Sequence, residues 1–102
     1  MLALLEKLNK TPILVRHPLP GFVWNRLQFA LLREALNIVN EGVVSAEDVD
    51  KVMEQGLGRR WQAIGPLKSV LLGGVGTFMS AAPPILQSLG SDEHLDSLSE
   101  AL

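Results

Sequence analysis

The sequence predicts a mainly α-helical protein. Apolar residues recur with helical spacing along most of the chain, helix-capping residues separate these segments, and only one short β-rich segment interrupts them. The 102 residues are enough for one small domain with one core. The 47% of apolar and 20% of charged residues are ordinary for a globular chain.

Composition argues against several classes of function. The net charge is −2 and no basic stripe exists, so we expect no nucleic-acid partner. The chain has no cysteine, which excludes disulfides and cysteine-based metal sites, and its two histidines stand in different contexts, so we expect no metal. The start "MLALLEKLNK" has neither the basic region nor the cleavage site of a signal peptide. We therefore expect a cytoplasmic location.

The first segments are predicted to be a helix and a strand. Leu2–Leu8 is expected to be a short helix with Leu2, Leu5 and Leu8 on one side. "TPILVRH", Thr11–His17, is rich in β-formers and is the only strand predicted. A single strand has no sheet to join, and an unpaired edge is a liability. The strand therefore suggests that the chain is part of something larger or borrows a partner.

Two helices are predicted in the middle of the chain. After the stiff linker "HPLPG", a long helix runs from about Gly21 to Glu41 and ends at Gly42. The next helix begins at the N-cap Ser45, carries two acidic residues in its first turn, and ends at Gly56.

The remainder is predicted to be a loop followed by interrupted helix. "GLGRRWQAIG", residues 56–65, is expected to be a glycine-bounded loop. From Pro66 onward we expect helix, broken at Gly73–Gly76 and at Pro83–Pro84, and then a last amphipathic turn or a frayed tail.

The stretch Ser69–Ser91 carries no charge and is long enough to span a bilayer. Its glycines and prolines suit a broken, buried helix better, so we expect no membrane partner. Solubility without detergent would exclude the alternative of a small membrane protein.

The long helix has an unusually broad apolar surface. Its apolar residues cover an arc of about 200°, whereas an ordinary surface helix needs a stripe of about 100°. The excess indicates either a central helix in a small bundle or burial against a second subunit or domain. Asn25 lies inside this arc, where an amide is either a structural residue or a ligand. The opposite, polar face is formed by Arg26, Arg33, Asn37 and Asn40, flanked by Glu34 and Glu41.

The residues from about Thr11 to Leu72 resemble the C-terminal domain of the 3-hydroxyacyl-CoA dehydrogenase family. The order and the long spacings of the family's short motifs both agree with this sequence. The matching motifs are Pro20-Gly21-Phe22, Asn25-Arg26-Leu27, Glu34-Ala35, Glu41-Gly42, Asp48-x-Asp50, Gly56-Leu57-Gly58 and Gly65-Pro66.

This resemblance implies a helical bundle of the 6-phosphogluconate-dehydrogenase-like type, with one N-terminal helix and an orphan strand left from a Rossmann domain. Residues 1–17 would be that remnant of an NAD-binding domain, residues 18–21 the hinge, and residues 22–102 the helical substrate and dimerisation domain. A homodimer is the implied assembly.

The segment after the glycines resembles one branch of the family. Arg60-Trp61 followed by Ile64-Gly65-Pro66-Leu67 looks like the branch that contains L-gulonate 3-dehydrogenase, lambda-crystallin and carnitine dehydrogenase. The resemblance implies NAD-dependent oxidation of a 3-hydroxy group to a ketone, on a hydroxy-acid or hydroxyacyl substrate. It places Asn25 at the substrate as an orienting residue. Arg60 would bind a substrate carboxylate or be a solvated charge, and Trp61 would line the substrate site or pack.

Parts of the family pattern are absent from these 102 residues. No Gly-x-Gly-x-x-Gly follows a strand, and "GGVGTF", Gly73–Phe78, fits a helix break better. The family's catalytic Ser, His and Glu lie in the absent domain, and neither His17 nor His94 matches its base. We therefore expect no cofactor-binding residue and no turnover by this chain alone; it would need a Rossmann NAD-binding domain in cis or in trans. The alternative is a stand-alone helical dimerisation module that has lost catalysis.

Overall fold

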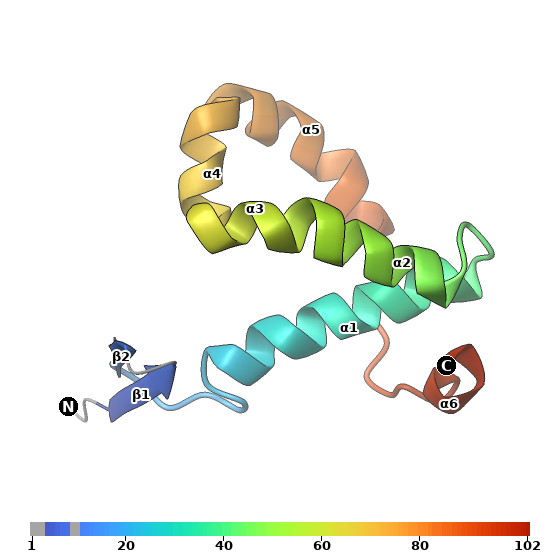
Figure 1. The fold of residues 1–102 in the computed structure, drawn as a ribbon, viewed down its shortest axis with the longest axis horizontal. Coiled ribbons are helices and arrows are strands. Elements are labelled where there is room, and N and C mark those ends of the chain that lie inside the picture. Colours follow the sequence, from blue (N-terminus) through green and yellow to red (C-terminus); the bar gives the residue numbers. More distant parts are fainter. Residues whose placement is uncertain (1–3, 9–10) are drawn as a thin grey trace. The chain divides into compact units, whose positions relative to one another are not determined.

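The computed structural model describes residues 4–8 and 11–102, and it is mostly helical, as the sequence predicts (Figure 1). The chain divides into two compact units, Met1–Leu32 and Arg33–Leu102. The elements are β1 (Leu4–Leu8), β2 (Thr11–Val15), α1 (Trp24–Asn40), α2 (Ala46–Val52), the π-helix η1 (Met53–Leu57), α3 (Gly58–Ala63), α4 (Pro66–Gly73), α5 (Val75–Ser88) and α6 (Leu98–Ala101).

The N-terminal segment forms a hairpin, which corrects two expectations. The helix predicted over Leu2–Leu8 is a strand over Leu4–Leu8, and residues 2–3 lie outside the described residues. The strand predicted over Thr11–His17 is confirmed over Thr11–Val15, but it is not an orphan, because β1 pairs with it in antiparallel register from Leu4 opposite Val15 to Leu8 opposite Thr11. Pairing satisfies the backbone groups of β2 that face β1, and this cross-strand bonding overrides the helix preference of Leu, Glu and Lys.

The helix α1 begins later than predicted. Gly21 and Phe22 have φ angles of 79° and 51°, in the left-handed region, so they form a turn instead of the first helical residues. The Phe22 N–H donates to the Leu19 carbonyl at 2.9 Å and closes this turn. The predicted end is confirmed, since Gly42 has a φ of 73° and its N–H bonds back to Val39 at 3.0 Å.

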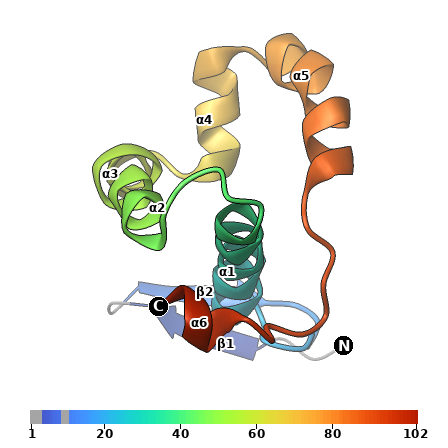
Figure 2. The same ribbon diagram turned by 90° about the vertical axis from the view of Figure 1, so that its right-hand side faces the viewer.

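The helix that starts at Ser45 does not end at Gly56. The N-cap is confirmed, because the Ser45 side chain accepts a hydrogen bond from the Asp48 N–H at 3.1 Å. The loop predicted over residues 56–65, however, is helical as far as Ala63, and α2, η1 and α3 follow one another as one rod (Figures 1 and 2). Gly58 has helical dihedral angles, φ −62° and ψ −39°, so it continues the helix. The helix ends where Ile64 becomes extended, before Gly65 and Pro66.

The helices α4 and α5 meet at a sharp bend of 115°. The predicted break is confirmed at Gly74, whose φ of 93° no helix interior accommodates. The break predicted at Pro83–Pro84 is wrong, because α5 runs through both residues. Two prolines remove two helical N–H donors, but their fixed φ near −65° is a helical value.

Among the described residues no single helix is long and apolar enough to cross a membrane. Taken together, α4 and α5 have the length and composition of one membrane span with a bend between them.

Few side chains are deeply buried in the part of the chain whose side chains are described, residues 13–102. Val15 is the buried apolar residue of the first unit and Leu36, at 8% exposure, that of the second. Ser69 is also buried, and its hydroxyl donates to the Pro66 carbonyl at 2.9 Å within the first turn of α4. Many large apolar side chains therefore remain exposed in this chain, more than single scattered residues would account for.

Candidate functional site

Asn25 is the second residue of α1 and belongs to the unit Met1–Leu32. Its N–H donates to the Gly21 carbonyl at 3.1 Å, and its Cβ lies so close to Gly21 that a methyl group there would come within 3.1 Å of it. Glycine at 21 thus lets the turn approach the start of the helix. The Asn25 amide is solvent-exposed, beside Trp24 and Leu27, which are also exposed. An amide in this position is available to a ligand or to another protein surface.

Arg60 and Trp61 are neighbours on α3, in the unit Arg33–Leu102. The Arg60 side chain is exposed in the last turn, where a cation interacts favourably with the helix dipole. The Trp61 ring is half-buried, and its Nε1 is enclosed without a hydrogen-bond partner among the described residues. The two adjacent side chains therefore have different surroundings: the guanidinium is exposed and accessible to an anion, whereas the indole is half-buried with its Nε1 enclosed.

The polar face of α1 binds the chain's own C-terminal segment, which the sequence did not indicate. The Glu34 carboxylate accepts a hydrogen bond from the Gly90 N–H at 2.7 Å and one from the Asn37 side chain at 3.4 Å. The Asn40 amide donates to the Ser97 hydroxyl at 2.9 Å, and that hydroxyl donates back at 3.1 Å. The sequence signal for this contact was the set of polar residues on one helix face, and exposure to solvent would explain that pattern equally well.

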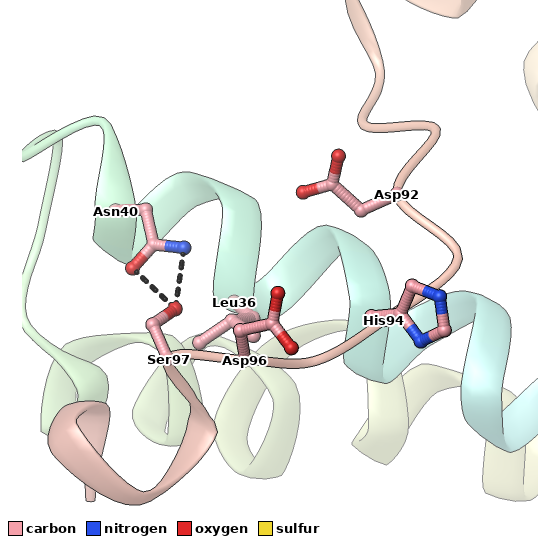
Figure 3. Close-up of a pocket in the computed structure, with 6 residues that line it drawn as sticks. All are labelled: Leu36, Asn40, Asp92, His94, Asp96 and Ser97. Carbon is pink, nitrogen blue, oxygen red and sulfur yellow. Dashed lines mark hydrogen bonds between the residues drawn. The ribbon is translucent and has the colours of Figure 1, made fainter.

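A shallow pocket of about 250 Å³ lies where this segment meets α1 (Figure 3). Leu36 and Asn40 come from the helix, and the pocket is completed by Asp92, His94, Asp96 and Ser97. Within residues 4–8 and 11–102, no group of three His, Asp or Glu side chains is placed to hold a metal ion. The pocket is polar and open, and Asn40 and Ser97 already satisfy each other.

The described residues do not form a dinucleotide-binding site. A Rossmann cradle needs a parallel strand that leads through glycines into a helix, whereas β1 and β2 are antiparallel. The glycines of residues 73–76 form the joint between α4 and α5. The described residues therefore supply no cradle for a nicotinamide cofactor.

Comparison with known proteins identifies the kind of domain. Residues 21–100 match the family "3-hydroxyacyl-CoA dehydrogenase, C-terminal domain". A solved NAD+-dependent dismutase, 5-formyl-3-hydroxy-2-methylpyridine 4-carboxylic acid 5-dehydrogenase, has the same fold over 84% of this chain and 29% of its own, with a TM-score of 0.77 and 32% identity. The chain belongs to the family of 3-hydroxyacyl-CoA dehydrogenase C-terminal domains.

Similar curated proteins lie in the branch that the sequence indicated. The lambda-crystallin homolog of Rattus norvegicus is 47% identical over 72% of this chain and 23% of its own length. Lambda-crystallin of Oryctolagus cuniculus is 40% identical over 87% of this chain and 30% of its own length. L-carnitine dehydrogenase of Oceanobacillus iheyensis is 42% identical over 68% of this chain and 22% of its own length. The chain thus spans about a quarter of the length of these relatives.

Proposed function

We propose that this chain is the substrate-binding and dimerisation domain of an NAD-dependent 3-hydroxy-acid or 3-hydroxyacyl-CoA dehydrogenase, which oxidises a 3-hydroxy group to a ketone. The match of residues 21–100 to the family's C-terminal domain carries this proposal. The NAD-binding domain and its catalytic base are supplied by another part of the protein or by another chain, and this domain alone is inactive. A cytoplasmic location is part of the proposal.

The exposed apolar surface of α1 supports the need for partners. Trp24, Leu27 and Phe29 are each more than half exposed, although they continue the apolar arc that includes the buried Leu36. Contiguous apolar surface of this kind marks an interface in a soluble protein. A second copy of this chain and the NAD-binding domain are the two partners that we propose for it.

The assignment of roles follows from chemistry and position. Asn25 has an exposed amide at the start of α1, and it would orient the substrate. Arg60 has an exposed guanidinium, whose planar fork of donors suits a carboxylate. The part of the half-buried Trp61 ring that stays exposed would form a wall beside it. One relative, the 5-formyl-3-hydroxy-2-methylpyridine 4-carboxylate 5-dehydrogenase of Mesorhizobium japonicum, is named for a compound with such a carboxylate.

Complementation tests the proposal. The chain is mixed with the separately expressed NAD-binding domain of a relative, and NADH formation is followed with a panel of hydroxy acids. We expect activity only in the mixture, and we expect Asn25→Ala to lower turnover while the dimer remains. Failure of every mixture, together with a stable dimer, would favour the alternative, a dimerisation module without catalysis.

A further inference from the structure

The rod formed by α2, η1 and α3 has one regular, half-buried side. Every residue between the members of this side is exposed. From Val49 to Trp61, half-buried residues follow one another at three successive intervals of four residues. The half-buried residues are Ala46, Val49, Met53, Leu57, Gly58 and Trp61.

A straight α-helix would not keep these residues on one side. Four residues advance about 400°, which is about 40° past a full turn, so three such steps would move Trp61 about 120° away from Val49. The π-helix Met53–Leu57 absorbs one extra residue, because the Gly58 N–H bonds to the Met53 carbonyl five residues back. One residue corresponds to about 100°, so the remaining offset is only about 20°.

Gly58 suits this turn because the backbone approaches it closely. A Cβ at Gly58 would collide with the Met53 carbonyl oxygen, whereas a Cβ at Gly56 would meet nothing within 4 Å. Gly58 is therefore needed for space, since its dihedral angles are ordinary helical ones. Arg60 precedes Trp61 by one residue, or about 100°, which places it on the exposed side of the rod.

We propose that the π-turn at Met53–Leu57 sets the rotational register of the rod, that is, the rotation of α3 about the rod axis relative to α2. It turns Trp61 onto the half-buried side of the rod and leaves Arg60 on the exposed side. Gly58 acts as a positioning residue for both. The statement that Arg60 contacts a carboxylate rests on the proposed function, but the rotational register of the rod does not.

Deleting Gly56 tests the register. Removal of one residue converts the π-turn into α-helix and keeps Trp61 aligned with Val49. In a Trp24→Phe background, where Trp61 is the only indole, we expect its emission maximum and acrylamide quenching to match those of the parent and of Gly56→Ala. Insertion of one alanine after Gly56 should expose the indole and at least double its quenching. If the deletion exposes the indole, or if the insertion leaves it quenched as in the parent, the proposal is overturned.

Coupling between the two glycines gives a second, independent test. Gly58→Ala should lower the urea midpoint in the parent chain, because the methyl group meets the Met53 carbonyl. In the Gly56 deletion the π-turn is gone, so the same Gly58→Ala change should cause little or no loss. An equal loss in both backgrounds contradicts the proposal. Lack of activity in the complementation experiment would leave these readouts unchanged, so the two proposals fail separately.

Discussion

At the scale of single residues, the best-defined features are hydrogen bonds that end or anchor an element. Ser45 was predicted as an N-cap from its position before an acidic first turn, and the structure confirms it. Glu34 was predicted only to flank a polar face, yet its carboxylate holds the Gly90 N–H. The first interaction joins residues three apart, whereas the second joins residues 56 apart, which no local pattern encodes.

Ser45→Ala should destabilise the chain by about 1 kcal/mol, because the Asp48 N–H loses its acceptor. Urea unfolding followed by circular dichroism measures the change. Ser45→Asp is the matched control, since aspartate caps equally well, and it should stay close to the parent. Equal stability of the alanine and aspartate variants would contradict the assigned cap.

Glu34→Ala should release the segment after α5. Loss of a hydrogen bond to a charged but half-buried group costs about 1 kcal/mol, so exchange of the Gly90 amide should accelerate about fivefold. Hydrogen exchange by NMR measures this rate. Glu34→Gln keeps one acceptor, so its exchange rate should lie between those of the parent and the alanine variant. Glu41→Ala, one residue past the end of α1, is the control and should leave exchange of the Gly90 amide unchanged. Unaltered exchange in the alanine variant would argue against the anchor.

At the scale of elements, glycine was easy to notice and hard to interpret. Gly42 and Gly74 end helices as predicted, because both adopt positive φ. Gly56 does not end its helix. Gly58 continues it with helical dihedral angles, and glycine is required there because the Met53 backbone leaves no room for a side chain. The residue type is the same, and only the surrounding backbone separates a terminator from a close contact.

Two glycines at the α4–α5 joint provide a matched pair. Gly74→Ala should destabilise the chain by about 1–2 kcal/mol, because a φ of 93° is strained for any residue with a Cβ. Gly76→Ala lies in the helical φ range with open space around it, so it should stabilise by about 0.5–1 kcal/mol. Thermal melts of both variants measure these opposite signs. Two variants that shift the melting temperature in the same direction would contradict the joint at Gly74.

At the scale of the whole molecule, the main feature is the large number of apolar side chains that are exposed. Leu27 is 58% exposed, and Leu71 and Leu72 on α4 are exposed even more. With so little apolar area buried among residues 13–102, this part of the chain gains little hydrophobic stabilisation on its own. Partners that cover these surfaces would therefore contribute a large part of its stability.

We predict that the chain self-associates at micromolar concentration and that Leu27→Lys weakens this association at least tenfold. The lysine places a charge on the apolar arc of α1 without disturbing a buried position. Light scattering after gel filtration measures the molar mass across a dilution series. Leu102→Lys, at a residue that is 93% exposed at the chain end, is the control. A monomeric parent at these concentrations would refute the interface on α1.

The sequence by itself determined the helical class, the Ser45 cap and the helix ends at Gly42 and Gly74, because each depends on local periodicity or on the chemistry of one residue. It also determined the family, through the order and the long spacings of short motifs. Only the tertiary structure decided the strand at Leu4–Leu8, the helical course of residues 56–63 and the anchoring of Gly90 on Glu34. These three depend on a hydrogen-bond partner or a carbonyl that lies outside the local pattern. Local propensity is worth only about a few tenths of a kcal/mol per residue, so these specific backbone contacts outweigh it.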